Sequence, residues 1–113
     1  FGDGAQTRDF VFVDDVVDAL VAAATAKDAN RAVINIGSGH ELSINALAAK
    51  AAQVTGLRVN ILHNREQSAG VSRLVADVSL AQEILAWAPR TELDQGLRLT
   101  LARDPRFQQP SAA

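Results

Sequence analysis

Two kinds of hydrophobic pattern alternate along this chain. Runs rich in β-branched and aromatic residues are typical of strands, whereas apolar residues that recur every three or four positions are typical of helices with one buried face. Strands are predicted over residues 10–13, 32–36 and 58–62, with a short extended piece at 74–76. Helices are predicted over residues 15–26, 44–55, 79–86 and from 91 onwards. Short strands that alternate with helices predict an α/β fold.

The ends of the predicted helices carry residues that suit helix termini. Ser43 and Asp77 can N-cap the helices that follow them. Gly56 suits the left-handed position at which many helices stop. Thr91, with Asp94 three residues later, resembles a capping box and predicts the start of the last helix.

Two groups of residues raise the question of a metal site. Adjacent Asp14 and Asp15 could be ligands, but aspartates before a hydrophobic run more often supply an N-cap and a first-turn carboxylate. We interpret them in this way. His40 and His63 lie far apart and lack the spacing of metal ligands. No metal site is therefore predicted.

Composition narrows the possible functions. The 113 residues are enough for one domain, and 48% hydrophobic with 21% charged residues is typical of globular proteins. A net charge of −2 argues against a nucleic-acid surface. No apolar run approaches the roughly 20 residues that span a bilayer, so no membrane partner is expected. The absence of cysteine fits a reducing compartment, and we expect a cytoplasmic location.

Several features predict that the chain is a fragment of a longer protein. It contains no methionine, it begins at the apolar residue Phe1, and its apolar faces exceed what so small a sheet can cover. Residues 1–103 are predicted to form one lobe, followed by a polar, disordered tail at 104–113. An apolar face without its partner domain predicts self-association or marginal stability.

A glycine-rich turn precedes the first predicted strand. Gly2 and Gly4 suit a turn, because glycine reaches positive φ without steric cost. The turn itself has no need of Arg8, whose planar fork is suited to phosphate or carboxylate recognition. One interpretation of Arg8 is a phosphate contact, and the other is a surface ion pair with Asp3 or Asp9.

Three motifs, in this order, resemble one protein family. They are GDGAQTRDFVFVDDVVDAL, AVINIGSGHELSINALA and GVSRLVADVSLAQEILAWAPRTELDQGL. Together they are similar to the C-terminal part of extended short-chain dehydrogenases/reductases, and more narrowly to the NAD-dependent nucleotide-sugar epimerase/dehydratase family. The resemblance covers about residues 1–103. It implies a small α/β substrate-binding lobe of a Rossmann-type enzyme.

The resemblance also implies what this chain lacks. In that family an N-terminal Rossmann domain binds NAD through a glycine-rich loop, and a Tyr-x-x-x-Lys pair performs the chemistry. The chain has no tyrosine, and Gly37-Ser38-Gly39 is followed by no third glycine at the needed position. We therefore expect no catalytic or cofactor-binding residue here. NAD is expected on the missing N-terminal domain, and the chain alone is expected to be inactive.

Four residues are substrate-binding candidates by the resemblance. Arg8 matches an arginine that contacts a substrate phosphate, and Ile44 matches an apolar position against the nucleotide base. Arg65 matches a second phosphate-contacting arginine, although residues 66–68 depart from the family pattern. Arg73 is the alternative for that second role.

Two functions remain open from the sequence. The first is the substrate-binding portion of a nucleoside-diphosphate-sugar epimerase or 4,6-dehydratase, in which the lobe anchors the diphosphate. The residues that distinguish these two enzymes lie outside the chain. The second is a freestanding, non-catalytic binding or interaction module with the same fold.

Overall fold

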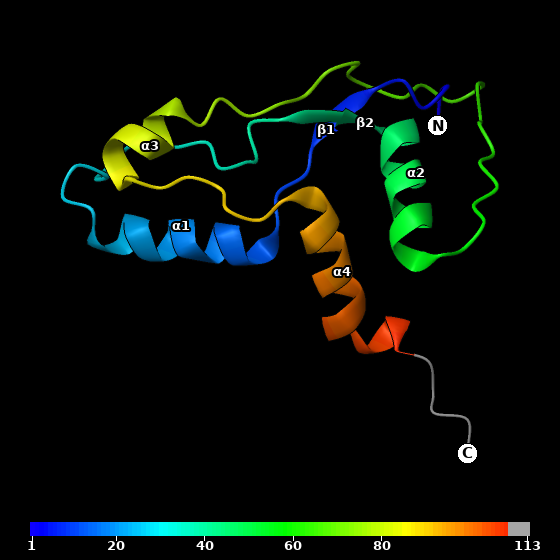
Figure 1. Ribbon diagram of the computed structural model, residues 1–113. Coiled ribbons are helices and arrows are strands. Elements are labelled where there is room, and N and C mark those ends of the chain that lie inside the picture. The colour runs from blue at the N-terminus through cyan, green and yellow to red at the C-terminus, as the bar shows by residue number, and fades with distance from the viewer. Residues whose placement is uncertain (109–113) are drawn as a thin grey trace.

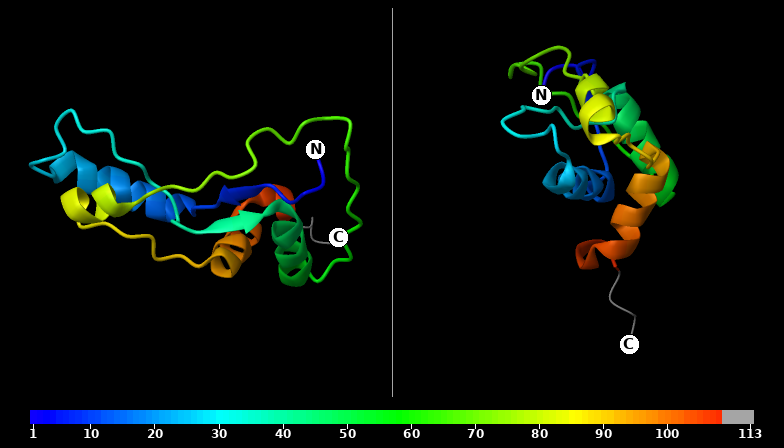
Figure 2. Two further views of the ribbon diagram at one scale, coloured as in Figure 1. Left: turned by 90° about the horizontal axis from the view of Figure 1, so that it is seen from above. Right: turned by 90° about the vertical axis from the view of Figure 1, so that its left-hand side faces the viewer.

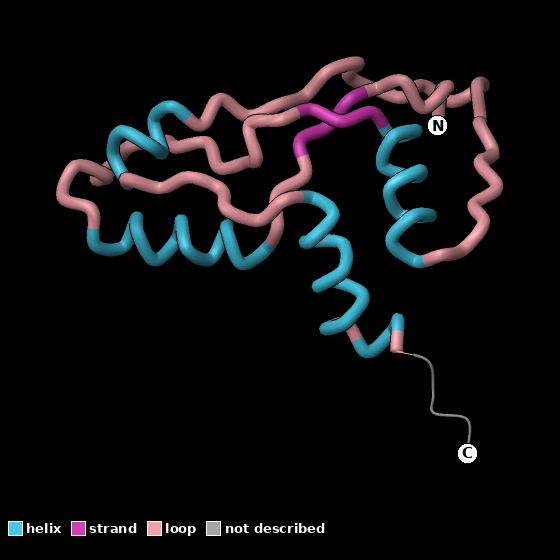
Figure 3. The backbone as a smooth tube through the Cα atoms, viewed as in Figure 1, coloured by secondary structure: helices cyan, strands magenta, loops and turns pink. Residues whose placement is uncertain are grey.

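The structure is a computed structural model that describes residues 1–108, and it combines helices with short strands (Figures 1 and 3). The helices are α1 (Val13–Thr25), α2 (Ile44–Thr55), α3 (Ser79–Leu85) and α4 (Leu93–Arg103). The strands are β1 (Thr7–Asp9) and β2 (Glu41–Ser43), and Pro105–Phe107 form a 3-10 turn. The predicted mixture of helices and short strands is confirmed, although the strands are shorter than predicted.

A short ribbon of extended chain joins distant parts of the sequence. β1 pairs antiparallel with β2, and Arg8 lies opposite Leu42. On the other edge of β1, the Thr7 N–H donates to Ser72 O (2.9 Å) and the Leu74 N–H donates to Thr7 O (3.2 Å). Residues 72–74 thus run parallel to β1 as an incomplete third strand.

The predicted strands at 10–13, 32–36 and 58–62 are wrong. β1 lies earlier, at Thr7–Asp9, and α1 already begins at Val13. Ile34 and Ile36 do alternate like strand residues and pack against the buried cluster. However, the backbone of residues 33–36 makes no hydrogen bond to any described residue. A strand requires a neighbouring strand to pair its N–H and C=O groups, and these segments have none among residues 1–108.

Helix α2 begins and ends as predicted. The Ser43 hydroxyl accepts a hydrogen bond from the Ala46 N–H (3.1 Å), and Gly56 adopts a left-handed φ of 70°. At α3, the Asp77 carboxylate accepts a hydrogen bond from the Ser79 N–H (3.0 Å), but the N-cap is Val78 and has no side-chain cap, so the N-cap predicted at Asp77 is wrong. Local signals therefore fixed both ends of α2.

Tertiary contacts override the other predicted caps. Phe12 is the N-cap of α1 and Glu92 that of α4, and neither makes a side-chain cap. The predicted cap at Asp14 and the predicted capping box of Thr91 and Asp94 are therefore wrong. The Thr91 hydroxyl donates to Asp15 (3.2 Å) instead, and Asp94 pairs with Lys50 (2.6 Å). Asp14 and Asp15 do lie in the first turn of α1.

The buried core lies between α1 and α3. It consists of Ala19, Ala81, Leu85 and Trp87. Asp15 is only 3% exposed. The Trp87 indole N–H donates to Asp15 O (2.9 Å), and the Asp15 carboxylate accepts from the Thr91 N–H (3.0 Å). These bonds attach the segment that follows α3 to the start of α1.

Helix α4 is held by contacts at both ends. Its first turn is joined to α2 by the Lys50–Asp94 ion pair. Near its C-terminus, Arg103 pairs with Asp14 (2.8 Å) and lies over the Phe12 ring at 5.6 Å from the centroid. The disordered tail predicted at 104–113 is wrong for its first residues, because Asp104 accepts a hydrogen bond from the Arg106 N–H (3.0 Å) and starts the 3-10 turn. Residues 109–113 lie outside the described residues.

The molecule is thin, as Figure 2 shows. Its extents are 49 × 43 × 18 Å and its radius of gyration is 17.1 Å. A compact domain of this length would have a radius of about 13 Å. Along α1, an apolar stripe faces solvent, and it comprises Val13, Val17, Leu20 and Val21. None of the helices among residues 1–108 is long and apolar enough to cross a membrane.

The carboxylate of Asp9 accepts four hydrogen bonds. They come from the Ser38 N–H (2.7 Å), the Ser38 hydroxyl (2.6 Å), the Gly39 N–H (3.0 Å) and the Ala76 N–H (3.1 Å). Burial alone would raise the pKa of Asp9, but the hydrogen bonds from Ser38, Ala76 and Gly39 outweigh burial, and its pKa is lowered. Asp9 therefore ties β1 to two remote segments through its charged form.

Asp9→Asn is expected to lower the free energy of unfolding by about 2–3 kcal/mol. A neutral amide oxygen is a weaker acceptor than a carboxylate, and the amide N–H groups would face the N–H groups that Asp9 now binds. Urea unfolding followed by circular dichroism measures this. Asp28→Asn is the control, since Asp28 is exposed. An equal effect of the two substitutions would contradict the role of Asp9.

The same carboxylate predicts a pH dependence. Because its pKa is lowered in the folded state, its contribution is fully present above the unfolded-state value of about 3.9 and is lost as the pH falls through the folded-state value. Below about pH 4, the unaltered chain should lose stability more steeply than Asp9→Asn. Parallel pH profiles of the two chains would contradict this.

The apolar stripe of α1 predicts self-association of the isolated chain. Leu20→Glu should lower the average mass measured by sedimentation, because a charge in the stripe opposes burial of apolar surface. Leu57→Glu is the matched control, because Leu57 is 68% exposed and lies outside the stripe. A stable monomer at every concentration of the unaltered chain would rule the prediction out.

Candidate functional site

Arg8 projects from β1 and is held by backbone carbonyls. Its Nη1 donates to Thr7 O (2.6 Å) and Val71 O (2.8 Å), and its Nη2 donates to Ala69 O (3.2 Å). The ion pair with Asp3 or Asp9 that the sequence left open is not formed. A guanidinium has five N–H groups, and within the described part of the chain the Nε–H and one Nη2–H of Arg8 have no acceptor. Arg8 also lines a hollow of about 370 Å³, together with Val11, Asn35, Ile36 and Leu74.

Strand geometry separates Arg8 from its neighbours in the sequence. Successive side chains of a strand point to opposite faces, so Thr7 and Asp9 share one face and Arg8 occupies the other. The contacts agree: the Thr7 hydroxyl donates to Glu41 (2.9 Å), and Asp9 binds Ser38 and Gly39. Anchoring and the presentation of Arg8 are therefore divided between two faces of one strand.

Ile44 lies close to Arg8 through the same ribbon. Its N–H donates to Gln6 O (3.1 Å), which continues the register of β1 and β2 by one pair beyond Thr7 and Ser43. Gln6 was not singled out by the sequence analysis. The alternation of side chains along an extended segment could have identified Gln6, because residues i and i+2, here Gln6 and Arg8, share a face.

Arg65 belongs to a segment that contacts the glycine turn. Gly2 and Gly4 have positive φ, as predicted, and the Gly2 N–H donates to Asn64 O (2.7 Å) and Gln67 O (3.1 Å). The pKa of Asp3 is lowered, first by the hydrogen bond from Ala5 and to a smaller extent by the charge of Arg65. The segment of residues 64–71 thus contacts both the glycine turn and Arg8. No hydrogen bond within residues 1–108 joins Arg65 to Arg8.

Arg73 lies on the other face of the ribbon. Its Nε donates to Glu41 Oε2 (2.6 Å), the oxygen that also accepts from the Thr7 hydroxyl. This hydrogen bond from Arg73, followed by the one from Thr7, lowers the pKa of Glu41. Arg73 therefore shares the face of Thr7 rather than that of Arg8. The structure therefore does not bring Arg73 and Arg8 together.

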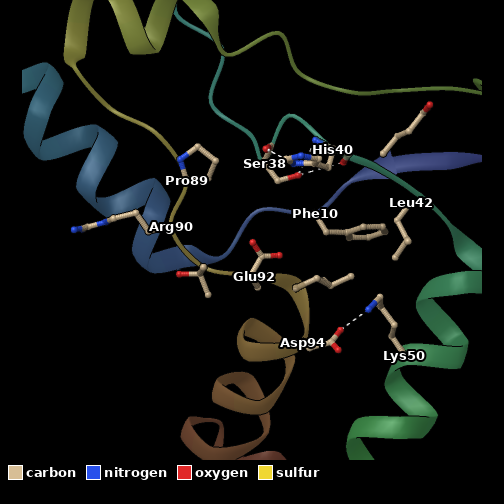
Figure 4. A pocket seen from close by; sticks show the side chains of 12 residues that line it. Phe10, Ser38, His40, Leu42, Lys50, Pro89, Arg90, Glu92 and Asp94 are labelled. Carbon is tan, nitrogen blue, oxygen red and sulfur yellow. Dashed lines mark hydrogen bonds and ion pairs between the residues drawn. The ribbon is translucent and has the colours of Figure 1, made fainter.

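A larger pocket, of about 530 Å³, lies between β2 and the start of α4 (Figure 4). Lys50 and Asp94 point toward each other across it and form an ion pair. Glu41 and Glu92 also line this pocket. Its carboxylates and its paired lysine make it a poor site for a phosphate. The hollow beside Arg8 is lined by one carboxylate, that of Asp9, which already accepts four hydrogen bonds.

The turn at residues 37–39 does not fit a dinucleotide. The N–H groups of Ser38 and Gly39, which a phosphate would need, donate to Asp9. A Cβ at Gly37 would lie 2.6 Å from both Asp9 Oδ2 and Ala76 Cβ, so this glycine permits close packing of the chain. Within the described residues, no group of three or more acidic or histidine side chains could hold a metal ion.

Comparison with known sequences gives a consistent result. The family model described as GDP-mannose 4,6 dehydratase matches residues 1–100. The putative UDP-glucose 4-epimerase of Methanocaldococcus jannaschii is 37% identical over 98 residues, which are 87% of this chain and 31% of that protein. The UDP-glucose 4-epimerase of Mycolicibacterium smegmatis is 36% identical over 101 residues, which are 89% of this chain and 32% of that protein.

Solved structures agree with the sequences. The UDP-glucose 4-epimerase of Thermotoga maritima, solved with UDP-glucose, has a TM-score of 0.81 and 36% identity, over 88% of this chain and 32% of that one. MoeE5, solved with UDP-glucuronic acid and NAD, has a TM-score of 0.77 and 41% identity, over 86% of this chain and 32% of that one.

The chain spans about a third of the length of the curated relatives it matches. The match runs over nearly all of its described residues and includes the glycine turn, Arg8 and the helices that follow. The chain therefore belongs to the nucleotide-sugar epimerase/dehydratase family of extended short-chain dehydrogenases/reductases, and it corresponds to the C-terminal part of these proteins.

Proposed function

We propose that this chain is the substrate-binding portion of an NAD-dependent nucleoside-diphosphate-sugar epimerase or 4,6-dehydratase, in which Arg8 anchors the diphosphate. The observation that carries the proposal is the state of Arg8: three of its N–H groups are fixed by backbone carbonyls, and two remain for a ligand. Relatives named for UDP-sugar epimerization, and a neighbour solved with UDP-glucose, support a nucleoside diphosphate as the ligand class.

The arrangement around Arg8 suits an anion with several oxygens. Hydrogen bonds from a guanidinium to phosphate are charge-assisted, and arginine stays protonated throughout the physiological range. Because Thr7, Ala69 and Val71 orient the guanidinium before any ligand arrives, less side-chain entropy is lost on binding. Binding energy from the diphosphate can then position the sugar for reaction elsewhere in the enzyme.

Arg65 is the better candidate for the second phosphate contact. The side chain of Arg73 is paired with Glu41 on the face opposite Arg8. The segment that carries Arg65 also carries the carbonyl groups that bind Arg8. Arg65 and these carbonyl groups therefore belong to one segment that contacts Arg8. Ile44, one residue pair from Thr7 in the ribbon, is proposed to contact the base.

NAD is assigned to the part of these enzymes that the chain does not span. Neighbouring structures contain NAD, whereas the donors of the turn at 37–39 are bound to Asp9. The apolar stripe of α1 and the unpaired backbone of residues 33–36 are features that such a part could cover. We propose that the N-terminal Rossmann domain packs there.

Arg8→Lys is expected to weaken binding of UDP or GDP by roughly 10- to 150-fold, since lysine keeps the charge but loses the fork, at about 1.5–3 kcal/mol. Calorimetric titration of the chain measures this. The structure also predicts a loss of stability of about 1–2 kcal/mol, because contacts to Ala69 and Val71 are lost. Arg98→Lys, at an exposed position of α4, is the control. If Arg8→Lys changed only stability, Arg8 would be purely structural.

The two candidates for the second arginine give opposite expectations. Arg65→Lys should weaken UDP binding by about tenfold, the equivalent of one charged hydrogen bond. Arg73→Lys should leave the affinity within about twofold and have little effect on stability, because the Arg73–Glu41 pair is exposed. The same titration decides between them, and the reverse ranking would assign the role to Arg73.

A further inference from the structure

The side chain of Gln6 contains an acceptor without a donor. Its Oε1 is buried and accepts no hydrogen bond from any described residue, whereas its Nε2 donates to Phe1 O (3.2 Å). The reversed amide would place Oε1 against the Phe1 carbonyl, where two acceptors would repel each other, so the observed orientation is the favourable one. A buried acceptor left unpaired costs free energy, and a donor from a ligand would recover it.

Gln6 lies between two residues already assigned to the ligand. It is two positions from Arg8, about 6.5 Å along an extended chain, and on the same face. It is also opposite Ile44, whose N–H donates to Gln6 O. A ligand whose diphosphate is bound by Arg8 and whose base contacts Ile44 would therefore bring its nucleoside to Gln6.

We propose that Gln6 Oε1 accepts a hydrogen bond from the nucleoside of the bound nucleoside diphosphate, which makes Gln6 a specificity-determining residue. This inference rests on the proposed function of Arg8. The donor is a ribose hydroxyl or a base N–H, the two kinds of donor that a nucleoside offers. The amide is held through one bond, to the carbonyl of Phe1, which is 73% exposed. Rotation of the Gln6 side chain can release that bond and turn the amide toward the ligand.

The test uses Gln6→Met, which keeps the length of the side chain and removes the acceptor. Titrations of the chain would use UDP, 2′-deoxy-UDP, 3′-deoxy-UDP and N3-methyl-UDP, with inorganic pyrophosphate as a probe of Arg8 alone. We expect Gln6→Met to bind UDP about tenfold more weakly and to bind pyrophosphate as the unaltered chain does. One analogue should bind equally to both chains, and the group it lacks identifies the donor. Gln53→Met, at an exposed position of α2, is the control.

Each other outcome counts against a specific claim. Equal UDP affinity of Gln6→Met and the unaltered chain would overturn the inference and leave the role of Arg8 intact. Equal losses for UDP and pyrophosphate, repeated with Gln6→Leu, would show that Gln6 only supports the strand, and would also overturn it. If the unaltered chain binds neither UDP nor pyrophosphate, the proposed function fails, and the assignment of Gln6 fails with it.

Discussion

The carboxylate of Asp9 joins three segments that are far apart in the sequence, and the position of the candidate site depends on this junction. Its four hydrogen bonds attach β1 to the turn at Ser38 and Gly39 and to the backbone of Ala76. A hydrogen bond to a charged acceptor is stronger than one to a neutral group. The Asp9 side chain can therefore hold the backbone N–H groups of Ser38, Gly39 and Ala76, as a neighbouring strand would in a sheet. In a thin molecule with a small core, this polar junction holds segments that hydrophobic burial does not.

The junction also explains why Arg8 and Asp9 are adjacent without forming an ion pair. Alternation along β1 directs Asp9 into the protein and Arg8 to the opposite face, where backbone carbonyls orient the guanidinium. Had the two charges met, the anchor would have lost acceptor capacity and the arginine would have lost donors. The hydrogen bonds of Asp9 fix the strand, and the fixed strand orients Arg8. Such preorganisation is what an anion site requires.

Local chemistry predicted part of this structure, and non-local pairing decided the rest. Helix α2 was predictable because Ser43, its apolar stripe and Gly56 act within a few residues of one another. The strand at 32–36 was mispredicted because its β-branched residues indicate only that the segment suits a buried position. Forming a strand also requires backbone hydrogen bonds to a partner strand. Thr91 and Asp94 had the spacing of a cap but bind Asp15 and Lys50, which the sequence places far away. Arg8 was predictable from its chemistry, whereas the choice between Arg65 and Arg73 required the register of the ribbon.

The mispredicted strand and the exposed stripe of α1 have one physical explanation. Ile34 and Ile36 pack inward against the buried cluster with the alternation of a strand, yet the backbone of 33–36 makes no hydrogen bond within residues 1–108. On α1, Val17, Leu20 and Val21 have the spacing of a buried face and are 49–66% exposed. Both patterns are typical of elements covered by a sheet, since a strand requires lateral hydrogen bonds and a helix stripe requires an apolar layer. The Rossmann domain proposed to pack here would satisfy both requirements at once, because a sheet offers lateral hydrogen bonds and an apolar face.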